Sequence, residues 1–248
     1  MNNNSSDPRL NMTEAFSKYF DHTLLKADAT QKDIRNLVEE AMEWDFAAVC
    51  VNGCHVKFTS EVMAELQSGS DDEAVGIAAV VGFPLGACTT ETKLYEAQAA
   101  IKDGAGEIDM VINIGAAKEG RWDYVENEIK RLTELCHGST APSGKPVLIK
   151  VIFETCLLDE DEIERICGIC GECGADFVKT STGFAASGAT AAHVSLMKKA
   201  AGPLVKVKAS GGIRTLSDAL AMIEAGADRL GCSASVQIMK EYSGSSDI

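Results

Sequence analysis

The sequence lacks any apolar run that approaches the roughly 18 residues a membrane-spanning helix needs. Its first residues, MNNNSSDPRL, also lack the apolar core of a secretory signal. Basic residues are scarce, 23 against 37 acidic ones, and they are scattered rather than gathered on one face. We therefore expect a cytoplasmic protein that binds neither membranes nor nucleic acid.

Cysteine is plentiful, but the pattern of a disulfide or metal protein is missing. The nine cysteines are odd in number, and several lie in apolar segments, so we interpret most of them as small buried residues in a reducing compartment. Cys167, Cys170 and Cys173 form C-x-x-C-x-x-C, yet no fourth cysteine follows at iron–sulfur spacing. We expect this helical segment to pack against the core and to hold no metal.

No linker or low-complexity block divides the chain, and apolar runs of four to eight residues alternate with longer amphipathic stretches. We predict one domain over residues 10–242, with flexible tails at 1–9 and 243–248. The predicted strands cover residues 20–24, 46–52, 75–83, 107–113, 147–154, 177–182, 204–209 and 229–233. The predicted helices cover 11–18, 30–44, 56–67, 89–103, 122–136, 159–173, 190–200, 215–225 and 233–241.

Apolar strands separated by helices are typical of a parallel sheet built from βαβ units. Eight such units in 248 residues predict an α/β protein, a single-domain (β/α)₈ TIM barrel with a short extra N-terminal helix. The alternative is an open doubly wound sheet, which the absence of G-x-G-x-x-G after the first strand disfavours.

A lysine stands in a strand that should be buried, in the segment GADFVKTSTGF at residues 174–184. Burying Lys179 there costs several kcal/mol unless its amine is paired or neutral. Asp109 and Lys208, on predicted strands four and seven, would also point into the barrel, so the three residues would form a charged group near its mouth. Internal ion pairs that only fill the barrel remain an alternative for Lys206 and for Lys150 with Glu154.

Two lysines close together have a chemical use, because only a neutral amine attacks a carbonyl and a free lysine is about 0.04% neutral at pH 7. A nearby second ammonium and partial burial lower the pKa of the first lysine. Lys179 is therefore the candidate nucleophile, with Lys208 beside it and Asp109 to transfer protons.

Glycine-rich segments follow the last two predicted strands, ASGGIRT at residues 209–215 and GCSAS at 231–235. Each is a weak signal alone, since glycine also marks plain turns. Together, with a helix that starts after the second one, they predict a phosphate site at the position where such barrels often have one.

The chain resembles the deoxyribose-phosphate aldolases, a family of class I aldolases, through nearly its whole length. The matching segments are DHTLL (21–25), VCVN (49–52), VVGFPLG (80–86), EIDMVINIGA (107–116), KVIFETCLL (150–158), GADFVKTSTGF (174–184), VKASGGIRT (207–215) and RLGCSAS (229–235). The resemblance implies a barrel that reversibly cleaves 2-deoxy-D-ribose 5-phosphate to D-glyceraldehyde 3-phosphate and acetaldehyde. It implies no cofactor, because a protonated imine serves as the electron sink.

The resemblance also assigns roles to residues. Lys179 would form the Schiff base, Lys208 would perturb its pKa, and Asp109 would act as acid and base with a water molecule. Residues around the 5-phosphate and the sugar would be Gly183, Gly211, Gly212, Gly231, Ser233 and Ala234, with Thr23 and Thr182 lining the sugar site. Cys50 matches a position that can react with aldehyde by-products.

Some residues depart from the family pattern. Gly53 and Cys54 replace a common proline and aromatic residue, which would loosen that loop, Ser235 replaces a frequent glycine, and Lys206 adds a lysine to strand seven. Two other functions stay open: a different imine-forming aldolase on another phosphorylated sugar, and a sugar-phosphate-binding barrel without turnover. The expected partners are phosphorylated sugars and aldehydes, and a homodimer would be unsurprising for the family.

Overall fold

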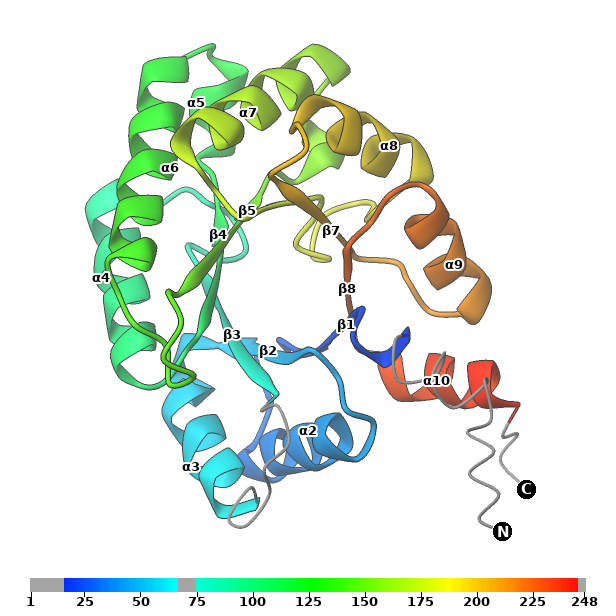
Figure 1. Cartoon of the computed structure of the whole chain (residues 1–248). Coiled ribbons are helices and arrows are strands. Elements are labelled where there is room, and N and C mark those ends of the chain that lie inside the picture. Colours follow the sequence, from blue (N-terminus) through cyan, green and yellow to red (C-terminus); the bar gives the residue numbers. More distant parts are fainter. Residues whose placement is uncertain (1–15, 67–74, 245–248) are drawn as a thin grey trace, which may run out of the picture.

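Eight parallel strands form a closed barrel in the computed structural model, which describes residues 16–66 and 75–244. The strands pair in sequence order, and β8 pairs back onto β1 through Phe20 and Leu230 (Figure 1). They are β1 (Phe20–Leu24), β2 (Ala48–Asn52), β3 (Gly76–Val81), β4 (Glu107–Val111), β5 (Leu148–Ile152), β6 (Phe177–Lys179), β7 (Lys206–Ser210) and β8 (Arg229–Cys232). The predicted (β/α)₈ barrel is confirmed, and the open sheet is wrong because an open sheet has no pairing between its first and last strands.

Helices surround the barrel on the outside (Figure 1). They are α2 (Gln31–Glu43), α3 (Val56–Leu66), α4 (Thr90–Lys102), α6 (Trp122–His137), α7 (Glu160–Cys173), α8 (Ala191–Ala200), α9 (Leu216–Glu224) and α10 (Ser235–Ser243). The predicted helix at 11–18 lies mostly outside the described residues, as do the tails except Ser243, which ends α10, and Gly244.

The main core lies between the strands and the helices. Alternate strand residues such as Ile149 and Val151 face outward, and they belong to the same buried cluster as Ile129 and Leu132 of α6. The opposite faces of the strands point into the barrel, as period-two alternation requires. Apolar packing therefore holds the barrel from outside and leaves its interior free for polar side chains.

Glycines close three of the helices where a strand follows within a few residues. Gly104, Gly174 and Gly226 have positive φ angles of 115°, 74° and 108°. A side chain at these angles would be strained, so glycine allows the short turn from each helix into the next strand.

Several short elements were absent from the sequence prediction. The helix α5 (Ile114–Lys118) follows β4, and the 3₁₀ turns η1 (Gly53–His55) and η2 (Thr155–Leu157) follow β2 and β5. They occupy segments in which no hydrophobic period can develop over three to five residues. Gly53 and Cys54 lie in η1, which leads directly into α3, and the expected loosening of this loop stays a prediction.

All nine cysteines are free thiols, and five of them are buried. Cys167 and Cys170 lie on the buried face of α7, whereas Cys173 is half-buried with its thiol 3.8 Å from the carbonyl oxygen of Glu126. The expected helix packing of this segment is confirmed. In the described ranges no group of three histidine, cysteine or acidic side chains is arranged to hold a metal ion.

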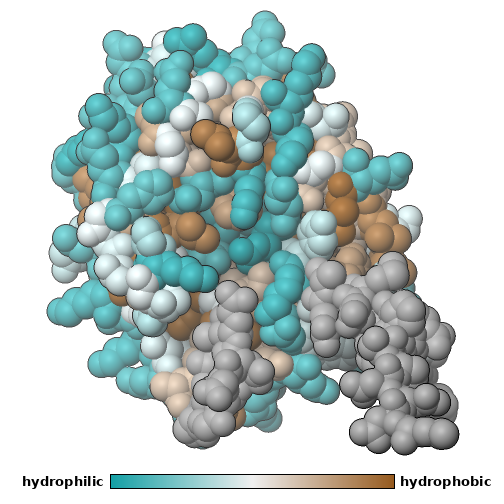
Figure 2. Space-filling model, viewed as in Figure 1, coloured by the Kyte–Doolittle hydropathy of each residue, from teal (hydrophilic) through white to brown (hydrophobic). Residues whose placement is uncertain are grey.

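The molecular surface is mostly hydrophilic on the side shown in Figure 2, where the hydrophobic patches are small and separate. Among the helices of the described part of the chain, none has the length and apolar character that a membrane span requires.

Candidate active site

Lys179 ends β6 and is buried inside the barrel, with 3% of its surface exposed. Its Nζ lies 2.7 Å from Oδ2 of Asp109, on β4. The Nζ of Lys208, on β7, lies 2.7 Å from the same oxygen atom. The structure thus brings together the three residues that the sequence singled out, with one carboxylate oxygen shared by two amines.

The two amines have opposite electrostatic surroundings. Burial lowers the pKa of Lys179, and nearby Lys208 lowers it further, while Asp109 acts against both. Burial also disfavours the charged form of Lys208, but Asp109 and Asp21 together outweigh it and raise its pKa above the ordinary value. The geometry therefore provides one amine that loses its proton readily beside one that remains an ammonium.

Asp109 is fully buried, which on its own would raise its pKa. The ammonium groups of Lys150, Lys179 and Lys208 outweigh this effect and hold the pKa of the carboxyl well below its usual range. The carboxyl is thus held in its ionised form, the form that accepts hydrogen bonds from the surrounding amines and can take up a proton, as a weak base.

Asp21 is a site residue that the sequence analysis missed. Its Oδ2 lies 2.5 Å from Nζ of Lys208, and its side chain is fully buried. The signal was present, because Asp21 shares the inward-facing parity of Thr23 on the first predicted strand. What it contacts was not readable, since its partner lies 187 positions away.

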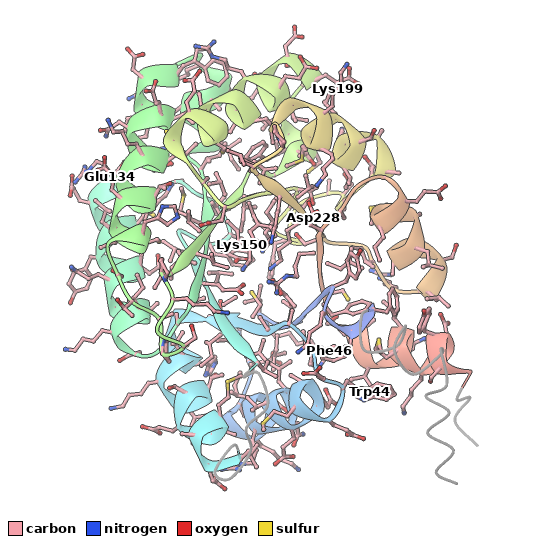
Figure 3. The ribbon with its side chains drawn as sticks, in the orientation of Figure 1. Trp44, Phe46, Glu134, Lys150, Lys199 and Asp228 are labelled. Carbon is pink, nitrogen blue, oxygen red and sulfur yellow. The ribbon has the colours of Figure 1, made fainter. Side chains whose placement is uncertain are left out.

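Lys150 also lies inside the barrel, in contrast to Glu134 and Lys199 on the outer helices (Figure 3). The suggested pairing of Lys150 with Glu154 is wrong. Lys150 donates to Glu107 and, at 2.8 Å, to Oδ1 of Asp109. Glu154 follows the end of β5 with a φ of 58°, which breaks the strand alternation, and its carboxylate accepts from the side chain and backbone of Thr182.

Lys206 starts β7 and is exposed at the opposite end of that strand from Ser210. Its ammonium lies 5.6 Å from the ring centroid of Phe177. The suggestion that Lys206 fills the barrel as an internal ion pair is wrong, because an exposed side chain at the start of the strand does not enter the interior.

The loops after β6 and β7 pack closely together at the mouth of the barrel. Gly183, Gly211 and Gly212 have positive φ angles of 86°, 82° and 82°. A Cβ atom on Gly188 would lie 2.1 Å from the carbonyl oxygen of Gly211, so only glycine permits this approach. The contact brings the three predicted phosphate-binding glycines of these loops into one region.

Ser233 and Ala234 lie at the N-terminus of α10, where Ala234 is the N-cap and supplies no side-chain hydrogen bond. The backbone N–H groups of the first turn are thus free of side-chain capping and can bind an anion. Ser235 is buried with its hydroxyl donating to the carbonyl of Cys232 at 3.1 Å, so this serine packs inward.

Gly231 has a different position from the other predicted phosphate ligands. It lies within β8, and a Cβ atom there would be 2.9 Å from Cε of Lys208. The absence of a side chain at this position leaves room for Lys208.

The remaining predicted site residues lie on both sides of this group. Thr23 is half-buried at the end of β1 and donates to the carbonyl of Asp21 at 2.8 Å. Thr182 is buried after β6 and contacts Glu154. Cys50 is fully buried on β2 opposite Thr23, and burial raises the pKa of its thiol. The thiol form of Cys50 is a weak nucleophile, so its reaction with aldehydes stays a prediction.

Comparison with known proteins agrees with this arrangement. A family model described as "DeoC/LacD family aldolase" matches residues 16–241. A protein of Clostridium novyi named deoxyribose-phosphate aldolase is 51% identical over 224 residues, which cover 90% of this chain and 95% of that protein. A protein of Thermococcus gammatolerans with the same name is 50% identical, with the same coverage of both chains.

Solved structures show the same likeness. The structure of "QR15, an Aldolase" is 41% identical with a TM-score of 0.81 and covers 92% of this chain and 96% of its own. A deoxyribose phosphate aldolase from Aeropyrum pernix, described as a unique tetramer, is 33% identical with a TM-score of 0.83 and covers 95% of this chain and 94% of its own. On the family match and these relatives, the chain belongs to the DeoC/LacD family of aldolases.

Proposed function

We propose that the protein is a class I aldolase that reversibly cleaves 2-deoxy-D-ribose 5-phosphate to D-glyceraldehyde 3-phosphate and acetaldehyde. The substrate is supported by relatives of about 50% identity that carry the name deoxyribose-phosphate aldolase. The single observation that supports the mechanism is the oxygen of Asp109 shared by Lys179 and Lys208 at 2.7 Å.

The reaction begins when the neutral Lys179 amine attacks the C1 carbonyl of the open-chain sugar. Attack leaves the nitrogen with two protons, and one of them moves to the carbonyl oxygen to give the carbinolamine. A second proton, taken up from solvent, lets this oxygen leave as water and gives the protonated imine. Asp109, through a water molecule, takes and returns these protons. Lys208 stays charged and keeps Lys179 from being protonated in the free enzyme.

Carbon–carbon cleavage follows from the imine. The C3 hydroxyl loses its proton, the C2–C3 bond breaks, and its electron pair moves into the protonated imine to form an enamine. C3 becomes the aldehyde of glyceraldehyde 3-phosphate. The enamine then gains a proton at C2, and water hydrolyses the resulting imine to acetaldehyde and free Lys179.

The phosphate would bind at the loops after β6, β7 and β8. Gly183, Gly211 and Gly212 offer backbone N–H groups, and the N-terminus of α10 adds its uncapped amides and its positive dipole end. Ser233, exposed beside them, can donate a further hydrogen bond. These loops follow the strands that carry Lys179 and Lys208, so the sugar would extend from the reactive amine toward the phosphate site.

Borohydride trapping with acetaldehyde or deoxyribose phosphate, followed by intact mass and peptide mapping, tests the imine. We expect a reduced adduct on the peptide carrying Lys179 in the parent and in the control Lys206→Met, and none in Lys179→Leu. Turnover without a trapped lysine would refute the imine, and neither adduct nor turnover would favour a barrel that only binds sugar phosphates.

Product analysis separates this proposal from an aldolase for another phosphorylated sugar. Release of acetaldehyde is expected only if the substrate is the deoxy sugar. The homodimer also remains a prediction, and light scattering of the purified protein would distinguish it from a tetramer such as that described for the Aeropyrum pernix relative.

A further inference from the structure

Two charged residues are the first residues of their strands, so they lie farther from the mouth of the barrel than the amine of Lys179. Arg229 is the first residue of β8, and Glu107 is the first residue of β4. The Nη1 of Arg229 lies 2.5 Å from Oδ1 of Asp21, and its Nη2 lies 3.4 Å from Oε1 of Glu107. Neither residue contacts Lys179 in these ion pairs, so neither has a direct part in the proposed chemistry.

These contacts close a ring of ion pairs. Asp21 joins Lys208, Lys208 joins Asp109, Asp109 joins Lys150, and Lys150 joins Glu107. Arg229 bridges Glu107 back to Asp21. Positive and negative groups alternate around this ring, three of each, so the ring is electrically neutral. Lys179 is outside it and touches it only through Asp109.

Titratable or charged groups point into the barrel from seven of its eight strands. The inward-facing titratable or charged groups are Asp21 on β1, Cys50 on β2, Glu107 and Asp109 on β4, Lys150 on β5, Lys179 on β6, Lys208 on β7 and Arg229 on β8. The strand β3, GIAAVV, contributes none. Glu154, buried just after β5, is bound by Thr182 and takes no part in these ion pairs. Among the strand residues, a protonated Lys179 is thus one positive charge beyond the balanced ring.

Most side chains of these ion pairs are buried, and Phe177, which is 3% exposed, packs beside them at the N-terminal ends of the strands. The Nζ of Lys150 and the Cζ of Arg229 lie 5.9 and 5.7 Å from the ring centroid of Phe177. Charges separated from water in this way act on one another more strongly than charges on a surface.

We infer that Arg229 and Glu107 are positioning residues that complete the neutral ring and thereby set the balance between the charged and the reactive form of Lys179. The inference rests on the proposed function of Lys179. Removing the positive charge at Arg229 leaves one negative charge in excess, which favours protonated Lys179. Removing the negative charge at Glu107 leaves one further positive charge in excess, which favours neutral Lys179.

The test measures the neutral fraction of Lys179 without requiring catalysis. Cyanate carbamylates neutral amines, so its rate at the Lys179 peptide is followed against pH by mass spectrometry, with the exposed Lys26 as reference in the same sample. A unit charge about 10 Å from an amine, at an effective dielectric constant of about 20, shifts the pKa of that amine by about one unit. The midpoint is the pH at which the carbamylation rate of Lys179 reaches half of its maximum. We expect Arg229→Gln to raise this midpoint by about one unit and Glu107→Gln to lower it.

Controls separate charge from shape. Arg229→Lys keeps the charge and should keep a midpoint near that of the parent, and Lys206→Met removes an exposed charge near the same Phe177 ring and should not move it. If Arg229→Gln does not fold, the direction measured with the isosteric Glu107→Gln decides. Midpoints that stay at the parent value, or that move in the same direction in both variants, overturn the inference. Borohydride trapping of the parent tests the imine separately, so failure of the proposed function would be recognised independently.

Discussion

Replacing Lys208 with methionine should reduce imine formation at neutral pH and leave it recoverable at high pH. The Nζ atoms of Lys179 and Lys208 each lie 2.7 Å from Oδ2 of Asp109, so they are at most about 5.4 Å apart. Two unit charges at ~5 Å with an effective dielectric constant of ~20 repel by about 3 kcal/mol, or roughly two pKa units. Without this repulsion the pKa of Lys179 rises, and its neutral fraction near pH 7 falls by about 100-fold.

The direction of the pH dependence follows from the sign of the shift. Burial and Lys208 lower the pKa of Lys179, so the reactive form appears as pH rises through that lowered value. In Lys208→Met the same rise in rate should occur at a pH about two units higher. The thioether of methionine retains most of the apolar volume of the lysine side chain and removes its charge.

The assay is the rate of borohydride-trapped adduct formation with acetaldehyde between pH 6 and pH 10, under single-turnover conditions, with folding checked by circular dichroism. We expect a loss of about 100-fold at pH 7 that shrinks toward the parent rate near pH 10. A loss of the same size at every pH would refute the electrostatic role of Lys208 and would indicate a positional one.

Three further predictions concern other parts of the molecule. Gly188→Ala would place a Cβ atom 2.1 Å from the carbonyl oxygen of Gly211 and so displace the loop after β7. We expect KM for the phosphorylated sugar to rise about tenfold or more, while acetaldehyde is still trapped by borohydride. An unchanged KM would contradict the proposed position of the phosphate loops. Cys50→Met should survive acetaldehyde longer than the parent, as measured by residual activity, and equal inactivation rates would remove Cys50 as the sensitive thiol. Lys93 and Glu128 form a fully buried ion pair at 2.7 Å. Lys93→Met should therefore lower the free energy of unfolding, measured in urea, by about 3–5 kcal/mol, and the double variant with Glu128→Leu should lose much less of it. Equal losses in the two variants would show that the pair is not coupled.

The order of the elements was readable from the sequence because it depends on local patterns. Short apolar strands, amphipathic helices and the glycines that end those helices recur along the chain, and parallel strands with intervening helices restrict the topology to few choices. Lys179, Lys208 and Asp109 were identifiable because a charge in an apolar strand is costly and therefore informative. The loops after β7 and β8 could be predicted as a phosphate site because such sites recur at that position in these barrels.

The tertiary structure alone decided which charges meet. Asp21 contacts Arg229 across 208 positions and Lys208 across 187, and no local pattern encodes a distance of that kind. The partner of Lys150 depended on the turn at Glu154, whose positive φ ends the strand alternation on which the sequence analysis relied. The sequence by itself determined a barrel with a lysine in a buried strand, whereas closure of the barrel placed the buried charges in a neutral ring, because only the folded chain brings the first and last strands together.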